Sequence, residues 1–469
     1  MKSVLIIAYS WPPDNCVGSL RPAYLAKQLA EHGWKPIVVT VREGYYEYLD
    51  SRRAVDPGNA LVLRTGCVPN PRSLYLGVKK ILFDLLGWQA RYEQIMLRGR
   101  GLEENKNQGS ESALARLKRF LLSLLYTPDE YQGWVLPGVA ESLKAIRRHR
   151  IDCMISTGPP FTAHLIGLAV KILSRIPWVA DFRDPWSFNE QRPPYLKSSL
   201  SDWIERRFER MVMERADHVV TVTPAMTQRY RDLYPRVSDK WVTITNGYDG
   251  DEFGPLAHVL PSLKFTVTYL GRFDYSRSPV QLLRAIGALK KEGLFDKDSV
   301  TVKFIGRCRW AGGLSVESMI REHGLEDIVE ITDMLPRVEA LREMLNAHVL
   351  ILLANEQTYQ VPGKAYEYLA ARRRILCMTE EEGATADLIK KYELGAVVSP
   401  HDEEAAKHIL SRWYTEVRTT PACPALGGSG GSQNLYEWAT LGNQYASLLD
   451  RFASPDRAAV KNARQIPVH

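Results

Sequence analysis

Cationic residues follow two predicted strands in the second half of the chain. Arg272 ends one strand and Arg277 follows shortly after, while Gly363 and Lys364 open a helix behind another strand. Ligands of open α/β sheets bind at the carboxyl ends of the strands. A guanidinium can bind phosphate oxygens in pairs, and the first N–H groups of a helix attract anions. We therefore predict a phosphate site here; the alternative is a pair of solvated loop arginines.

The first half offers residues that could act on a second substrate. Arg183 and Asp184 follow the strand predicted over 178–182. Asp184 could orient a hydroxyl or accept its proton, or the two could form a structural ion pair. His164 is a further catalytic candidate, although a lone helical histidine is more often structural. Gly18 lies in the first strand–helix loop, where glycine permits close approach of the backbone to a ligand or simply forms a turn.

Strands and helices alternate over most of the chain, which predicts an α/β fold with parallel sheets covered on both faces. Val4–Ala8 is an apolar strand, Ser19 can cap a helix that runs to His32, and Ile37–Val41 is the next strand. Further strands are predicted in the first half over 153–156, 178–182, 219–222 and 241–245, and in the second half over 265–270, 300–305, 328–331, 349–353, 375–378 and 396–398.

The length of 469 residues predicts at least two domains. We expect doubly wound, Rossmann-like domains over 1–255 and 256–426. Residues 427–433 are predicted to form a flexible Gly/Ser linker, 434–455 a helix that packs back on the body, and 456–469 a tail.

Residues 73–126 interrupt the alternation. Leucines recur there at helical spacing beside Lys79, Lys80, Arg116 and Arg119. Basic amphipathic helices of this kind can lie on anionic membrane surfaces. The alternative is that they pack on the first domain.

Composition excludes several classes of protein. Hydrophobic residues make up 45% and charged residues 25%, as in globular proteins with real cores. The formal net charge of +7 is modest, and no dense basic stripe with interleaved aromatics indicates nucleic-acid binding. Six scattered cysteines lack metal-ligand spacing and predict reduced thiols in the cytoplasm. No apolar run approaches the ~18 residues of a membrane span.

Several segments, taken in order, resemble the retaining family-4 glycosyltransferases of the GT-B fold, and more narrowly bacterial enzymes of capsule, exopolysaccharide and O-antigen assembly. The segments are Trp11-Pro12-Pro13 with Gly18, residues 156–160, residues 181–186, Ala216-Asp217, residues 246–249, Gly271-Arg272 and residues 363–369. The resemblance implies two Rossmann-like domains facing across a cleft.

The resemblance also implies roles for the residues of the second half. Arg272 and Arg277 would bind the diphosphate of a nucleotide-sugar donor, with the helix start at Gly363 and Lys364, and Glu367 would accept hydrogen bonds from the ribose hydroxyls. Gly18 would approach the donor's phosphate and sugar from the first domain.

The chain departs from the family pattern at one position, because Tyr359 stands where many relatives carry a second glutamate. The sugar that the enzyme would select is therefore left open. In the family the leaving phosphate helps to deprotonate the acceptor, so no strong nucleophile is required.

We expect no cofactor and no metal, and interpret Asp249-Gly250-Asp251 as a solvated turn. The expected partners are a nucleotide sugar and a saccharide or lipid-linked saccharide acceptor, with peripheral contact to the inner face of the membrane and no nucleic acid. Two alternatives remain, a GT-B nucleotide-sugar epimerase and a non-catalytic binding subunit. An NAD-dependent Rossmann enzyme is disfavoured, because the first strand–helix loop lacks G-x-G-x-x-G.

Overall fold

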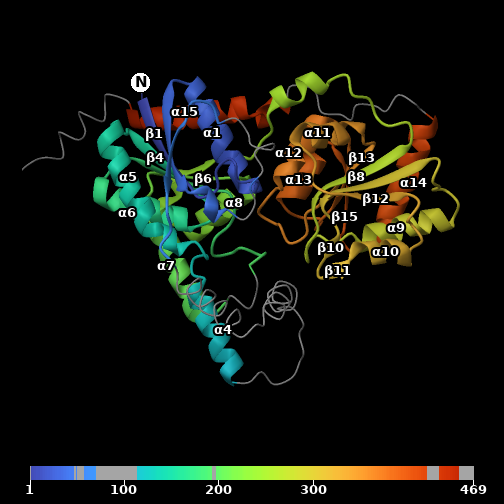
Figure 1. Cartoon of the computed structure of the whole chain (residues 1–469), viewed down its shortest axis with the longest axis horizontal. Helices are drawn as coiled ribbons and strands as arrows, with labels where there is room; N and C mark the ends of the chain where they lie inside the picture. The colour runs from blue at the N-terminus through green and yellow to red at the C-terminus, as the bar shows by residue number, and fades with distance from the viewer. Residues whose placement is uncertain are drawn as a thin grey trace, which may run out of the picture. The chain divides into compact units, whose positions relative to one another are not determined.

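The computed structural model describes residues 2–46, 49, 57–69, 113–192, 197–419 and 433–453. These residues divide into two compact units (Figure 1). The first contains the chain up to Thr245 together with the segment that starts at Trp438, and the second runs from Asn246 to Glu437. Most of the 73–126 insertion, the Gly/Ser linker and the predicted tail lie outside the described residues.

The described part of the first unit is built on seven parallel strands in the order β3-β2-β1-β4-β5-β6-β7. The strand order reverses between β1 and β4, where Ile6 of β1 is in register with Val38 on one side and Ile155 on the other. The strands are β1 (Lys2–Ala8), β2 (Trp34–Val41), β3 (Leu61–Thr65), β4 (Cys153–Gly158), β5 (Trp178–Phe182), β6 (His218–Thr221) and β7 (Trp241–Thr243).

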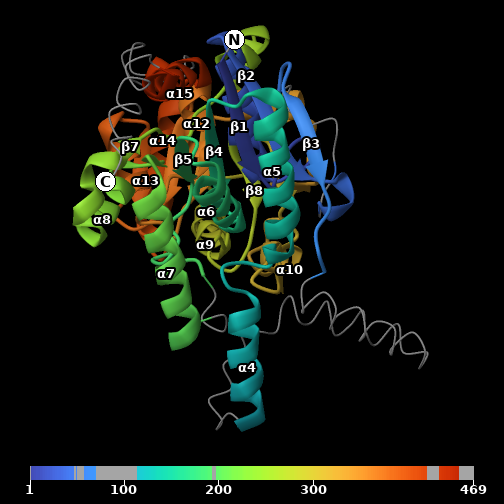
Figure 2. The ribbon, with the colours of Figure 1, turned by 90° about the vertical axis from the view of Figure 1, so that its left-hand side faces the viewer.

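Helices cover both faces of this sheet (Figure 2). The helix at the C-terminal end, α15, packs on α1, and its residues Leu441, Tyr445 and Leu448 are all buried. The described helices of the unit are α1 (Leu20–Glu31), α4 (Ala113–Leu125), α5 (Val135–His149), α6 (Thr162–Ser174), α7 (Ser199–Arg215), α8 (Pro224–Leu233) and α15 (Trp438–Ala453).

The second unit repeats the same plan within its described residues, with six parallel strands in the order β12-β9-β8-β13-β14-β15. Its order reverses between β8 and β13, so the loops after these two strands flank the usual ligand position. The strands are β8 (Phe265–Arg272), β9 (Val300–Arg307), β12 (Val329–Thr332), β13 (Val349–Leu353), β14 (Arg374–Met378) and β15 (Gly395–Val398).

The helices of the second unit alternate with these strands, and a small hairpin of β10 (Trp310–Ala311) and β11 (Leu314–Ser315) follows β9. The helices are α9 (Val280–Lys291), α10 (Val316–Glu322), α11 (Arg337–Asn346), α12 (Gly363–Ala371), α13 (Ala384–Lys391) and α14 (Glu403–Thr419). The two units therefore confirm the predicted pair of doubly wound, Rossmann-like α/β folds.

A buried ion pair fastens α1 and α15 to the first sheet. The Arg21 guanidinium on α1 donates to the Asp181 carboxylate at the end of β5, with Nη2–Oδ1 at 2.8 Å. The Tyr445 hydroxyl of α15 donates to the same Oδ1 at 2.6 Å, and Thr157 donates to Oδ2 at 2.7 Å. Burial alone would raise the pKa of the Asp181 carboxyl, but Arg21 and these hydrogen bonds hold it below its usual value.

Candidate functional site

Two arginines are gathered at the carboxyl end of β8 by one carboxylate. Arg272 is the last residue of β8, and its Nη2 lies 3.4 Å from Asp274 Oδ2. Arg277 Nε lies 3.6 Å from the same oxygen, and the Arg277 backbone N–H donates to Asp274 Oδ1 at 3.0 Å. The Arg272 side chain is 58% exposed. The loop therefore holds an exposed guanidinium, that of Arg272, and a partly buried one, that of Arg277, at a position suited to an anion.

The start of α12 lies beside the same strand end. The backbone N–H of Leu270 in β8 donates to the Tyr368 hydroxyl of α12 at 3.3 Å. Burial raises the pKa of the Cys308 thiol, just after β9, to about 12, and the positive charge of Lys364 partly offsets that rise. Since β13 pairs with β8 and α12 follows β13, Lys364 lies at the same edge of the sheet as the end of β8. The structure thus brings the predicted donor-side residues Arg272, Arg277, Gly363 and Lys364 to one edge of one sheet.

Glu367 belongs to the same group and is almost completely buried. Its Oε1 accepts a hydrogen bond from Arg337 Nη1 at 2.6 Å. Arg337 is the first residue of α11 and also donates to both carboxylate oxygens of Glu252. The acidic residue predicted to contact the ribose is therefore held by a guanidinium on a neighbouring helix.

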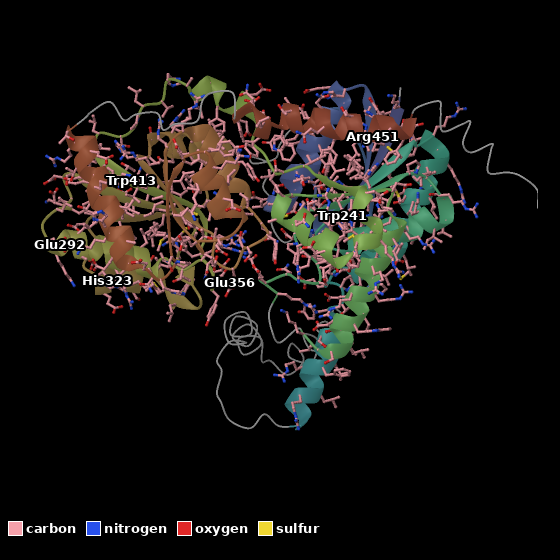
Figure 3. All side chains as sticks on the ribbon, turned by 180° about the vertical axis from the view of Figure 1, so that it is seen from behind. Trp241, Glu292, His323, Glu356, Trp413 and Arg451 are labelled. Carbon is pink, nitrogen blue, oxygen red and sulfur yellow. The ribbon has the colours of Figure 1, made fainter. Side chains whose placement is uncertain are left out.

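The loop between β13 and α12 contains Tyr359 in place of the family's second glutamate. The loop is fastened to the segment after β14, because the backbone N–H of Glu356 donates to Glu380 Oε1 at 3.0 Å and that of Ala384 donates to the Thr358 carbonyl at 2.9 Å. Glu356, labelled in Figure 3, is exposed and has a positive φ of 57°. Tyr359 is half-buried, so an aromatic side chain occupies this part of the loop.

In the first unit, Arg183 joins the loops at the point where the strand order reverses. Its guanidinium donates to the backbone carbonyls of Gly18 and Pro159. A Cβ atom added at Gly18 would lie 3.1 Å from Arg183 Nη1, so the glycine allows this close approach. These contacts favour a structural role for Arg183. Asp184 follows it in sequence, half-buried and at the end of β5.

His164 lies in the core, where its side chain is completely buried. Its Nδ1 is 2.8 Å from the Ser156 hydroxyl, and its ring stacks on Phe182 with a centroid distance of 4.2 Å. Burial lowers the pKa of the His164 imidazole to about 3, so the ring is neutral near pH 7. The sequence allowed either a catalytic or a structural role for His164. Its buried, neutral environment favours the structural role.

The burial of His164 predicts a loss of stability in mild acid. Its folded pKa of about 3 lies below the unfolded value near 6.5, so only the unfolded chain takes up a proton as the pH falls between these values. We expect this residue to lower the free energy of unfolding by about 2 kcal/mol between pH 7 and pH 5. Urea unfolding of the wild type and of His164→Gln at both pH values measures the effect. An equally steep decline in the variant would contradict the assignment.

Arg337 and Glu252 are site residues that the sequence did not single out. Eighty-five positions separate them in the chain, and no local pattern links them. One signal was available, because a cation at the first residue of a predicted helix opposes the helix dipole and requires compensation. Glu252 ends a short turn that Asp249 caps by accepting from the Asp251 N–H at 3.1 Å.

Comparison with known protein families assigns both halves of the chain. Residues 20–247 match the glycosyl transferase 4-like domain, and residues 257–419 match the glycosyl transferases group 1. The chain belongs to the family-4 glycosyltransferases of the GT-B fold. A search of curated protein sequences found no match.

Solved structures of similar fold cover nearly the whole glycosyltransferase chain. Sucrose-phosphate synthase from Thermosynechococcus elongatus has a TM-score of 0.61 at 15% identity and covers 97% of this chain and 100% of its own. A glycosyltransferase from Rickettsia africae has a TM-score of 0.60 at 13% identity, and the match covers 97% of this chain and 99% of the Rickettsia chain. HepE from Anabaena, solved with UDP-glucose, has a TM-score of 0.56 at 12% identity, and the match covers 96% of this chain and 100% of HepE. At these identities the likeness establishes the fold.

None of the helices in the described ranges is long and apolar enough to cross a membrane.

Proposed function

We propose that this glycosyltransferase moves a sugar from a nucleoside-diphosphate sugar to a hydroxyl of a saccharide or lipid-linked saccharide, with retention of the anomeric configuration, in the synthesis of a cell-surface polysaccharide or glycolipid. The observation that carries the proposal is the grouping of Arg272, Arg277, Lys364 and Glu367 at the switch point of the second sheet. The UDP-glucose complex of HepE supports a nucleotide sugar as the donor.

Each member of this group has a part in the proposed reaction. The departing nucleoside diphosphate gains negative charge, and Arg272, Arg277 and the N-terminus of α12 would stabilise it without a change of their own protonation. Lys364 would add a further cation. Glu367 would fix the ribose, and thereby the position of the anomeric carbon. In the first unit, Asp184 would orient the acceptor hydroxyl, while Arg183 would shape the loops around it.

A direct test measures sugar transfer. Purified protein is incubated with UDP-, GDP-, ADP- and dTDP-sugars, with and without a membrane glycolipid extract as acceptor, and released nucleoside diphosphate is quantified. The proposal predicts release that depends on the extract, and NMR of the product is expected to show the donor's anomeric configuration. Conversion of the donor into an epimer without acceptor would favour the nucleotide-sugar epimerase instead.

The two-helix surface formed by α4 and α7 supports a lipid-linked acceptor. The two helices extend from the same end of the first unit (Figures 1 and 2), and the Ser123 hydroxyl of α4 donates to Ser198 at the start of α7 at 2.7 Å. This surface exposes large apolar side chains beside arginines. The apolar members are Leu117, Phe120, Leu121, Leu200 and Trp203, and the basic members are Arg116, Arg119, Arg206, Arg207 and Arg210. Such a surface suits the interface of an anionic bilayer.

Removing two of the arginines is expected to weaken membrane binding. A basic side chain near an anionic membrane surface contributes about 1 kcal/mol to the free energy of membrane binding. Arg206→Gln/Arg207→Gln should therefore lower the partition coefficient onto phosphatidylcholine–phosphatidylglycerol vesicles roughly thirtyfold. Cosedimentation at 0.1 M salt measures this. Trp203→Ala should also weaken binding, because the exposed indole suits the headgroup region.

A matched control lies on α5 of the same unit, where Arg147 and Arg148 are adjacent and exposed. Arg147→Gln/Arg148→Gln removes the same charge and is expected to keep most of the binding. Equal losses in the two double variants would show a general charge effect and would contradict the assignment of this surface.

A further inference from the structure

Arg337 lies between two carboxylates of the second unit. Its Nη1 donates to Glu367 Oε1 at 2.6 Å, its Nη2 donates to Glu252 Oε2 at 2.6 Å, and its Nε lies 3.2 Å from both Glu252 oxygens. One planar guanidinium thus uses separate N–H groups for two acidic residues that are far apart in sequence. The same guanidinium therefore fixes the orientation of both carboxylates.

The position of Arg337 is unfavourable for a cation, which suggests a role beyond stabilising the fold. It is the first residue of α11, where the partial positive charge of the helix N-terminus disfavours a cation. Its side chain is only 21% exposed, and that of Glu367 only 9%. Such ion pairs contribute little net stability compared with apolar packing, so a contribution to stability does not by itself account for this one.

We propose that Arg337 is a positioning residue for Glu367, which it orients toward the ribose hydroxyls of the donor. This inference rests on the proposed function. A carboxylate offers about four acceptor sites, so a hydrogen bond from Arg337 to Oε1 is compatible with additional ones from a ribose. Arg337 is the first residue of a helix that follows β12, and Glu367 lies in the first turns of a helix that follows β13, so both lie toward the carboxyl edge of the sheet that holds Arg272.

Glu252 completes the arrangement by holding the other side of the guanidinium. It ends the short turn η7 (Gly250–Glu252), and nearby the Tyr248 backbone N–H donates to the Tyr436 carbonyl at 3.0 Å. Gly250 approaches Glu437 so closely that an added Cβ atom would lie 2.9 Å from its Oε1. The turn that carries Glu252 is thus anchored to the segment before α15. Arg337 is thereby fixed from a second direction.

The preference for ribose over 2′-deoxyribose provides the test. Binding of UDP, GDP and ADP and of their 2′-deoxy forms to the full-length chain is measured by calorimetry. The wild type is expected to prefer the ribose form of its cognate nucleotide roughly 10- to 100-fold, the range for hydrogen bonds to a charged group. Arg337→Gln should reduce that preference to within about threefold, mainly by weakening the ribose form. Glu252→Gln should reduce it partially.

A double variant separates positioning from general support of the fold. Glu367→Gln should lose the preference, and adding Arg337→Gln to it should cause no further loss. A purely structural Arg337 would instead weaken ribose and deoxyribose forms equally, which would overturn the inference. If Arg337→Gln lowers the melting temperature strongly, Arg337→Lys keeps the charge without the planar fork and should show the same loss of preference. If the wild type binds none of the six nucleotides, the assignment of a uridine, guanosine or adenosine diphosphate donor is wrong, and the part of the proposed function that names such a donor fails with it.

Discussion

Arg272→Ala is expected to weaken binding of the cognate nucleoside diphosphate roughly 10- to 100-fold, the range for charge-assisted hydrogen bonds. The Arg272 guanidinium is largely exposed and borders Asp274 at 3.4 Å. Its removal would take away a phosphate ligand and would leave the Asp274 carboxylate to repel the diphosphate. The loss should therefore be smaller in Arg272→Ala/Asp274→Asn. Calorimetric titration of the two variants and the wild type measures both effects.

Arg284 provides the matched control for this prediction. It lies on α9 of the same unit, its side chain is half exposed, and its Nη1 is 3.9 Å from Glu403. Arg284→Ala should bind the nucleotide as the wild type does. If Arg272→Ala bound equally well, Arg272 would be a solvated loop residue, and the proposed diphosphate site would be wrong.

Asp181→Asn is expected to destabilise the first unit by about 3–5 kcal/mol, because it leaves the buried Arg21 charge without a compensating carboxylate. Both side chains are almost inaccessible to solvent. The amide retains the shape of the carboxylate, so packing changes little and the effect should come from charge. Chemical denaturation at pH 7, followed by tryptophan fluorescence, measures the change in the free energy of unfolding.

Tyr445→Phe provides a graded comparison, because it removes only the hydroxyl that donates to Asp181. It should cost about 1–3 kcal/mol and should expose α15 to proteases before the rest of the unit. A wild-type unfolding curve for Asp181→Asn would show that the ion pair is not required to hold α1 and α15 on the sheet.

The repetitive part of the fold was predictable because buried parallel strands are short apolar runs between amphipathic helices. The predicted strands at 178–182 and 349–353 coincide with β5 and β13. The edge strand β3 (Leu61–Thr65) was missed, because its burial pattern is mixed and one residue of the five is an arginine. The helices α5 and α7 were also missed, since polar residues interrupt their apolar faces.

The grouping of the proposed donor-side residues was predictable because they follow strands whose order the topology determines. The surroundings of the proposed acceptor-side residues were less predictable, because residues there serve the core as well as the surface. Asp129 accepts a hydrogen bond at 2.8 Å from the Thr162 N–H at the start of α6, and so supports that helix. Trp134 is fully buried and donates to Thr65 at 2.8 Å. The Arg337 contacts depend on tertiary structure alone, so no spacing in the sequence could have revealed them.

The most direct test of the central claim is a thermal-shift screen of the purified chain against nucleoside diphosphates and nucleotide sugars with different bases. A ligand at 100 times its dissociation constant stabilises the folded state by about 2.7 kcal/mol, which raises the melting temperature measurably. We predict that the compounds of one base raise it, and that Arg272→Ala and Glu367→Gln sharply reduce the rise. No shift with any compound of the panel would contradict the donor site and favour a non-catalytic binding subunit.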